Sequence, residues 1–236
     1  ETVPSTGQDD ATSLFRALGS RNYRLFFAGQ AVSLTGFWMQ KVATGWLVYR
    51  LTHSPLALGV VDFAGSIPLL LLTPFTGALL ERWNLKNTFF LCQALCCLQS
   101  LALAALTLTG LVSYAQLVVL SLFLGVVNAF EMPTRHSLVP QLVDRRGDLG
   151  NALALNSSLF NVARLVGPSV AGFAIARMGE GPCFLTNGLA YSATLLAVLA
   201  MRLPPTSGQG ISPRSPLEDL REGWRYSLRH GSIRLP

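Results

Sequence analysis

The sequence predicts an all-α membrane protein with six membrane-spanning helices, and three observations indicate this. Half of the residues are hydrophobic and only 13% are charged, whereas soluble domains carry about 25% charged residues. The mean hydropathy over the chain is +0.43. Six apolar segments follow one another, each near the ~20 residues that a helix needs to cross a bilayer. A soluble chain of 236 residues could not bury so much apolar surface with so few charges.

The six apolar segments are predicted as helices because a helix satisfies its own backbone hydrogen bonds in lipid, whereas an open strand does not. They form a bundle over residues 23–201, with the ranges Tyr23–Val48, Pro55–Leu79, Thr88–Gly110, Ser113–Phe130, Asn151–Met178 and Pro182–Met201.

Polar segments flank the bundle. Residues 1–22 are predicted as a cytoplasmic segment with a short amphipathic helix over Thr12–Ser20. Residues 202–236 begin with a Pro- and Gly-rich linker and continue into an amphipathic helix over 215–230, which starts with the Ser-Pro-Leu-Glu pattern of a capped helix. The chain does not begin with Met and stops just after this charged segment, so we expect a piece of a longer protein. No signal peptide is expected.

The basic residues predict the orientation, because Lys and Arg collect on the cytoplasmic side of a membrane. With the N-terminus inside, the outer loops hold only Arg50 and Arg177, and every other basic loop residue and the basic tail lie inside. Both termini are therefore predicted to be cytoplasmic, in a bacterial plasma (inner) membrane. The net charge of +6 belongs to these loops and the tail, without a dense basic stripe, so no nucleic-acid partner is expected.

Ionisable side chains inside a bilayer cost about 2.5–3.5 kcal/mol each, so those within the segments are functional candidates. Lys41 and Asp62 lie at similar depth on either side of the first outer loop, roughly 10 Å below the surface at ~1.5 Å per residue. We hypothesise that they form an ion pair. The pair either locks the two helices together or makes Asp62 a proton site.

Two helix faces are predicted to line a central cavity. Ser157, Asn161 and Arg164 share one face of the fifth segment, and lipid would not accept that face. Arg164 would bind an anionic substrate or pair with a carboxylate. A mixed face of the first segment suits an amphipathic substrate and equally suits ordinary hydrogen bonding between helices; it consists of Gln30, Ser33, Phe37, Gln40, Lys41 and Thr44.

The loop after the second segment runs from Gly77 to Lys86 and reads GALLERWNLK. It resembles the cytoplasmic loop motif G-x-L-x-D-R-x-G-R-[RK] of the major facilitator superfamily, and it falls between the second and third helices, as in that superfamily. The matching residues are Gly77, Leu79, Arg82 and Lys86, while the departures are Glu81, Asn84 and Leu85.

The fifth segment contains ARLVGPSVAG from Ala163 to Gly172, which is similar to the superfamily's antiporter motif, G-x-x-x-G-P-x-x-G-G, associated with exporters. Gly167, Pro168 and Gly172 match, and alanines replace two glycines. Further stretches resemble the enterobactin-exporter-like branch, so that the resemblance covers nearly all of Phe15 to Arg229. A bend at Pro168 beside the glycines gives either a rocking interface or static packing.

The resemblance implies a fold and a function. Superfamily members have twelve helices in two halves, each built from two inverted three-helix repeats. This chain is then the N-terminal half, and its partners are a missing C-terminal six-helix half, the lipid bilayer, a small siderophore or drug-like substrate, and protons. We expect proton-coupled efflux by alternating access, in which the isolated half does not transport.

The run from Ala129 to Arg135 resembles the branch's acidic-x-Pro-x-Arg turn, so Glu131 is predicted to end the fourth helix. A cytoplasmic charge cluster that breaks as the inner gate opens is expected from Glu81, Arg82, Lys86, Glu131 and Arg135. The alternative is solvated loop charges, worth under about 1 kcal/mol per pair.

Three other functions are weighed against transport. An intramembrane enzyme needs paired Asp, a Ser/His pair or a metal cluster, and the sequence offers none. An ATP-driven half-transporter needs a nucleotide-binding domain, and no Walker-type motif is present. A non-transporting six-helix scaffold or subunit remains the alternative. No metal or other cofactor is expected, because zinc-type spacing is absent from the four cysteines, Cys92, Cys96, Cys97 and Cys183.

Overall fold

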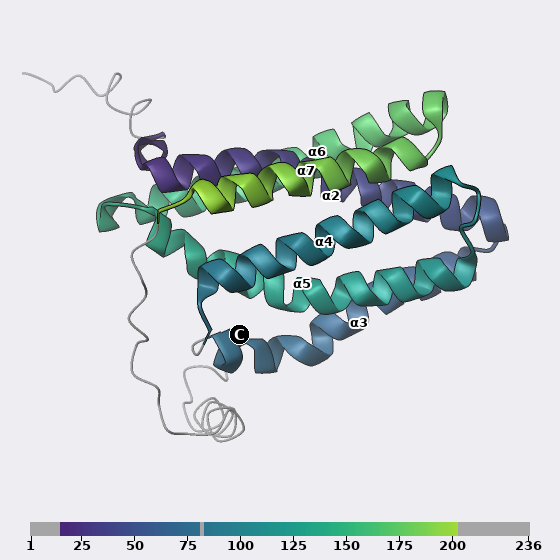
Figure 1. The fold of residues 1–236 in the computed structure, drawn as a ribbon, viewed down its shortest axis with the longest axis horizontal. Helices are drawn as coiled ribbons and strands as arrows, with labels where there is room; N and C mark the ends of the chain where they lie inside the picture. The colour runs from purple at the N-terminus through teal and green to yellow at the C-terminus, as the bar shows by residue number, and fades with distance from the viewer. Residues whose placement is uncertain (1–14, 81–82, 203–236) are drawn as a thin grey trace, which may run out of the picture.

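The computed structural model describes residues 15–80 and 83–202, and these are helical apart from short connections (Figure 1). The 3-10 helices η1 (Arg16–Gly19) and η2 (Arg146–Asp148) are short. The six long helices are α2 (Arg21–Thr52), α3 (Pro55–Leu80), α4 (Leu85–Leu108), α5 (Tyr114–Leu142), α6 (Leu149–Met178) and α7 (Gly181–Ala200). The predicted all-α class is confirmed.

Five of the long helices in the described part of the chain are long and apolar enough to cross a membrane, and α2 is not one of the five. The reason lies in the side chains that α2 presents to the other helices. Gln30, Ser33 and Gln40 are all buried within the bundle, which lowers the hydropathy of α2 without exposing polar groups to lipid. A helix that is polar on its inner face can still belong to a membrane bundle.

Successive helices alternate in direction, and hydrogen bonds fix which ends meet. Asn22, at the start of α2, exchanges two hydrogen bonds with the backbone of Arg202, just beyond α7, at 2.9 and 3.1 Å. Lys86, at the start of α4, donates from Nζ to the carbonyl oxygen of Met201 at 2.6 Å. The start of α2 and the end of α7 therefore lie on the same side of the bundle, as six crossings of a membrane require.

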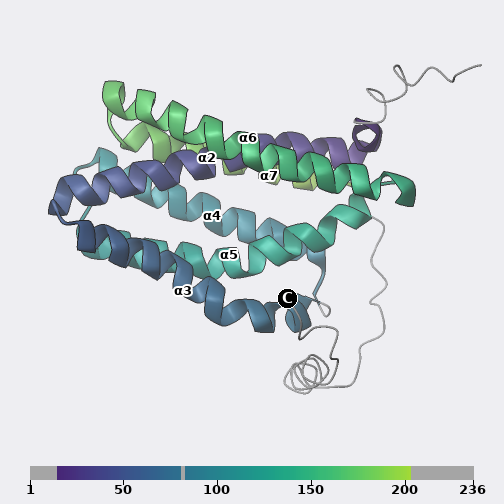
Figure 2. The ribbon, with the colours of Figure 1, turned by 180° about the vertical axis from the view of Figure 1, so that it is seen from behind.

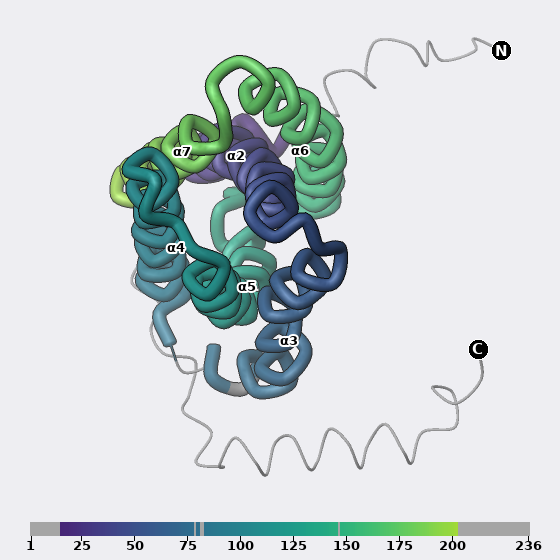
Figure 3. Tube along the Cα trace, turned by 90° about the vertical axis from the view of Figure 1, so that its right-hand side faces the viewer, coloured from purple at the N-terminus to yellow at the C-terminus, as the bar shows by residue number. Residues whose placement is uncertain are grey.

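The helix contacts follow the pattern of two inverted three-helix repeats. Helix α2 packs between α6 and α7, α5 packs between α3 and α4, and α4 packs on α7. Figure 3, viewed along the bundle, shows both arrangements, and Figure 2 shows α3 and α5 side by side. Suppose that α2, α3 and α4 are exchanged with α5, α6 and α7, respectively. The α2–α6 contact then becomes the α5–α3 contact, and the α2–α7 contact becomes the α5–α4 contact. The same exchange leaves α4–α7 unchanged.

Glycines set the closest approach in two contacts that this exchange relates. On α5, a Cβ at Gly125 would overlap the carbonyl oxygen of Gly65 on α3. On α6, a Cβ at Gly167 would lie 2.5 Å from the Cβ of Trp38 and 2.9 Å from the carbonyl oxygen of Thr35, both on α2. Small residues at these positions let the helix backbones pack closely, which lipid does not drive by itself.

Two sequence predictions need correction. Helix α5 continues through Pro133 to Leu142, so the prediction that Glu131 ends the fourth helix is wrong. Proline is tolerated inside membrane helices where packing against neighbouring helices compensates for its missing donor, and here residues beyond Pro133, among them Thr134, Leu138 and Val139, are buried within the bundle. Near the N-terminus, only Arg16–Gly19 of the expected helix over Thr12–Ser20 is helical among its described residues.

Other predicted segments lie outside the described residues. These are most of the cytoplasmic segment 1–22, nearly all of the tail 202–236 with its amphipathic helix 215–230, and the loop residues Glu81 and Arg82.

Candidate functional site

The bundle encloses a cavity of about 240 Å³ that is lined mainly by α2, α3 and α5. Helix α4 adds Gln93, Cys96 and Gln99, α6 adds Phe160, and α7 adds Tyr191. Nine of the side chains proposed from the sequence line this one cavity, namely Gln30, Ser33, Phe37, Gln40, Lys41, Thr44, Asp62, Glu131 and Arg135. The cavity therefore brings together charges from three helices that are distant in the sequence.

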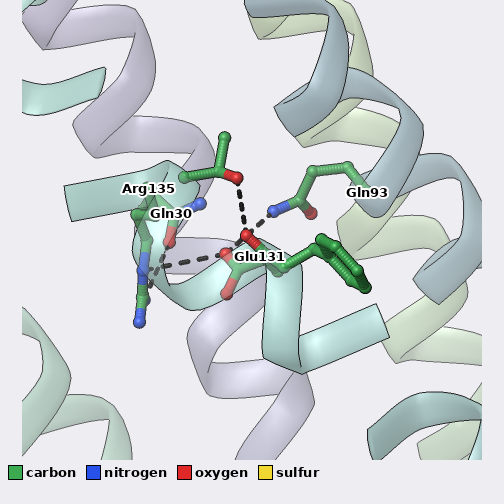
Figure 4. Close-up of polar contacts among 6 residues, drawn as sticks. Gln30, Gln93, Glu131 and Arg135 are labelled. Atoms are coloured by element: carbon green, nitrogen blue, oxygen red, sulfur yellow. Dashed lines mark hydrogen bonds and ion pairs between the residues drawn. The ribbon is translucent and has the colours of Figure 1, made fainter. Parts of the chain in front are cut away.

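An ion pair lies in the cavity wall towards the end at which the chain enters the bundle. Arg135 Nε is 3.7 Å from Glu131 Oε1, one helical turn away on α5. Arg135 also donates from Nη1 to Gln30 Oε1 at 3.4 Å, and Gln93 donates from Nε2 to Glu131 Oε1 at 3.4 Å. Figure 4 shows Glu131 between Gln93 and Arg135. Only 6% of the Arg135 side chain and 13% of the Glu131 side chain are exposed, so these are not solvated loop charges.

The same wall contains buried polar atoms that lack a hydrogen-bond partner within residues 15–80 and 83–202. They are Gln30 Nε2, Gln93 Oε1 and Arg135 Nε. Buried polar groups in proteins are nearly always satisfied, so three exceptions around one ion pair mark this wall as unusual. Two are donors and one is an acceptor, and the Arg135 Nε donor lies 3.7 Å from Glu131 Oε1, beyond hydrogen-bond distance.

Lys41 and Asp62 both line the cavity, but the structure does not join them. The ion pairs within 4.0 Å in the described part of the chain do not include these two residues. Lys41 Nζ instead lies 5.7 Å from the centre of the Trp38 ring, and Asp62 is exposed. The two residues lie at similar depth and line the same cavity, but their side chains are not in contact.

A buried amide network closes the cavity near Gln40. The Oε1 atom of Gln40 accepts from Ser100 Oγ at 2.7 Å and from Asn187 Nδ2 at 2.8 Å, and its Nε2 donates to Gln99 Oε1 at 2.9 Å. The network joins α2, α4 and α7, and all four side chains are buried. Gln40 therefore holds three helices together as well as lining the cavity.

The predicted face of α6 lies beside the cavity rather than in its lining. Asn161 and Arg164 are exposed; Asn161 Nδ2 donates to the carbonyl oxygen of Ser157 at 2.9 Å, and Arg164 Cζ lies 5.6 Å from the centre of the Trp38 ring.

The three residues of the antiporter-type motif differ in their surroundings. Gly167 is buried against α2, Pro168 is half-buried, and Gly172 is exposed with no atom within 4 Å of a Cβ built there. Of the three, Gly167 alone makes the close approach that the motif predicts.

Of the five residues in the expected charge cluster, three are described, and Lys86 lies apart from Glu131 and Arg135. Glu131 and Arg135 point into the cavity, whereas Lys86 binds the Met201 carbonyl oxygen at 2.6 Å. Gly77 is exposed, with no atom within 4 Å of a Cβ built at its position. Glu81 and Arg82 lie outside the described residues, so their part in a gate stays a prediction.

Sequence reasoning missed Gln93, Gln99 and Trp38. The two amides lie inside an otherwise apolar segment, and a polar side chain in such a segment is itself a sign of an inward-facing position. Trp38 carried no such signal, because an aromatic residue fits lipid, packing and binding equally well.

Comparison with known proteins gives a family match. A family model described as "Transmembrane secretion effector", one of the major facilitator superfamily, matches residues 12–235. The staphyloferrin A transporter of Staphylococcus aureus is 26% identical over 190 residues, which cover 78% of this chain and 46% of that protein. The multidrug efflux pump Tap of Mycolicibacterium fortuitum is 29% identical over 194 residues, which cover 78% and 47%. The chain spans about half the length of the curated relatives it matches.

Proposed function

Because the chain belongs to the transmembrane secretion effector family of the major facilitator superfamily, we propose that it forms half of a proton-coupled exporter of small amphipathic molecules. The second half would be a further six-helix bundle. Relatives named as a siderophore transporter and a multidrug efflux pump support a siderophore or drug-like substrate. Transport would proceed by alternating access, with the cavity opening to each side of the membrane in turn.

The observation that carries this proposal is the charge content of the cavity. Lys41, Asp62, Glu131 and Arg135 line one cavity within the helical bundle. Charged side chains are expensive in a membrane, and they are found there where they serve ion or substrate pathways. Aromatic side chains, Phe37, Phe160 and Tyr191, share the lining and suit the apolar part of an amphipathic molecule.

The two carboxylates are the proposed proton acceptors. A proton on Glu131 would remove the charge that holds Arg135, and Gln30 Oε1 would still accept a hydrogen bond from the freed guanidinium. A proton on Asp62 would change the field around Lys41 in the same cavity. Each protonation would favour a different arrangement of the helices, which is the requirement for coupling.

The proposed orientation follows from the end at which α2, α4 and α6 begin. The basic residues there include Arg16, Arg21, Arg24, Lys86 and Arg145, whereas the loops at the opposite end hold Arg50 and Arg177. The positive-inside rule places the more basic end in the cytoplasm. Both described ends of the chain would then face the cytoplasm of a bacterial cell.

Proteoliposomes test the function. The chain joined to its proposed second half should export ethidium or carboxyfluorescein when a proton gradient is imposed, and a protonophore should abolish this flux. Asp62→Asn or Glu131→Gln should flatten the dependence of the flux on pH, while Asp144→Asn, an exposed loop change, should not. Absence of gradient-driven flux, or an unchanged pH profile in both cavity variants, would contradict the proposal.

A further inference from the structure

Two positive charges from different helices converge on one aromatic ring. Lys41 Nζ of α2 and Arg164 Cζ of α6 lie 5.7 and 5.6 Å from the centre of the Trp38 ring. A cation over an aromatic face is attracted only weakly at an exposed site, and two cations that share a ring repel each other. The two cations at this ring therefore need a negative charge to balance them.

Neither cation has an acidic partner in the described part of the chain. The ion pairs found there use Arg16, Arg50 and Arg135. Both Lys41 and Arg164 are exposed, so an entering molecule can reach them. Asp62 and Glu131 are the acidic groups that line the adjacent cavity; Glu131 is already paired with Arg135, and Asp62 is not within 4.0 Å of Lys41.

The packing of α6 on α2 holds the two charges in place. Gly167 lets the α6 backbone contact Trp38 and Thr35, and Arg164 lies one helical turn from Gly167 on the same face. Phe160, one turn further, packs edge-on against Trp38 at 5.7 Å. The position of Arg164 is thus set by backbone contact and ring packing rather than by a flexible loop.

The cluster opens onto the cavity. Phe37, Lys41 and Phe160 all contact the Trp38 ring and all line the cavity. The indole Nε1 of Trp38 is buried and has no hydrogen-bond partner among the described residues. The rim between α2 and α6 therefore offers two cations and aromatic surface, and these groups together suit an organic anion.

We propose that Lys41, Trp38 and Arg164 form the binding site for the acidic groups of an organic anion, which would be the substrate of this cavity. The inference rests on the proposed transport function and adds the substrate's charge. The carboxylates of the ligand bind the Lys41 ammonium and the Arg164 guanidinium, and its carbon skeleton lies against Phe37 and Phe160.

The fluorescence of Trp38 provides a direct test in nanodiscs. A full chain that carries Trp46→Phe, Trp83→Phe and Trp224→Phe keeps Trp38 as its one indole. We expect citrate to change the Trp38 emission saturably at constant ionic strength. Triethyl citrate, which has the same skeleton without charge, should bind at least about tenfold more weakly, because hydrogen bonds to charged groups are the strong ones.

Substitutions then test whether Lys41 and Arg164 form the citrate-binding site. Lys41→Gln and Arg164→Gln should each weaken citrate binding about tenfold or more, and Lys41→Arg and Arg164→Lys should restore most of it. Arg177→Gln is the matched control, because Arg177 lies on the same helix over a different ring, that of Phe173, at 5.0 Å. Circular dichroism and gel filtration check that each variant is folded.

Two results would overturn the inference. One is equal binding of citrate and triethyl citrate. The other is a loss of binding in the Lys41 and Arg164 variants no greater than in Arg177→Gln. The titration needs no gradient and no flux, so citrate binding without proton-driven export would contradict the proposed function alone, and export without selective citrate binding would contradict this inference alone.

Discussion

Arg135 reaches back one helical turn to Glu131 within the continuous helix α5, and both side chains are almost fully enclosed by the bundle. The two amides beside them, Gln30 and Gln93, bind the guanidinium and the carboxylate respectively. The pair is therefore a buried, hydrogen-bonded charge pair. Such pairs respond very differently to the removal of one partner and to the removal of both.

Arg135→Met should destabilise the protein strongly, because it leaves the Glu131 carboxylate buried without its counter-charge. Breaking a buried pair costs about 3–5 kcal/mol in soluble proteins. The double variant Glu131→Gln/Arg135→Met should unfold at a higher temperature than Arg135→Met alone, since no uncompensated charge remains. Thermal unfolding in detergent, followed by circular dichroism, measures both, and a double variant less stable than Arg135→Met would contradict the assignment.

The two glycines of the antiporter-type motif should respond oppositely to alanine. Gly167→Ala should lower the unfolding temperature, because the new Cβ would meet the Trp38 Cβ at 2.5 Å and overpacking costs about 1–3 kcal/mol. Gly172→Ala should be neutral or stabilising, since no atom lies within 4 Å of its Cβ and alanine favours a helix by about 0.5–1 kcal/mol. Equal effects in a thermal melt would show that the α2–α6 contact is misplaced.

Gln40→Met should destabilise the bundle by removing the shared acceptor of Ser100 and Asn187. A buried donor left without a partner costs about 1–3 kcal/mol, and Ser100 keeps a second acceptor in the Phe184 carbonyl oxygen. Most of the loss should therefore come from Asn187. Gln141→Met, at an exposed position of α5, is the control, and a Gln40 variant as stable as this control would rule out a structural role for the network.

Cysteine labelling tests the orientation. The four native cysteines are buried, so added cysteines should dominate the reaction with a membrane-impermeant maleimide. Leu111→Cys, at an exposed site between α4 and α5, should react in intact cells, and Gly147→Cys, at an exposed site of η2, should react only after permeabilisation. The reverse pattern would place the basic end of the bundle outside the cell.

Sequence alone predicted the number and order of the helices, because apolar length is a property of each segment by itself. The ends of the helices were harder to predict. Pro133 suggested a turn, yet α5 continues because residues beyond it, such as Thr134 and Leu138, are buried against the other helices. Helix α2 looked the same as its neighbours in length, but the buried amide of Gln40 is satisfied by residues from other helices.

The sequence predicted which residues belong to the site better than it predicted which of them contact one another. Depth along a helix can be counted from the sequence, so Lys41 and Asp62 were placed at one level. The rotation of each helix about its axis cannot be counted, and rotation decides whether two side chains touch. For the same reason the sequence did not show that Arg164 and Lys41 share Trp38, or that Glu131 lies between Arg135 and Gln93.

The exchange that maps α2, α3 and α4 onto α5, α6 and α7 leaves α4–α7 as a contact of corresponding helices. The α2–α5 contact is likewise mapped onto itself, whereas the α2–α6 and α2–α7 contacts each have a separate counterpart in the other repeat. A substitution at the α4–α7 surface, where Cys97 of α4 approaches the Gly188 carbonyl oxygen of α7, therefore acts on both repeats at one contact.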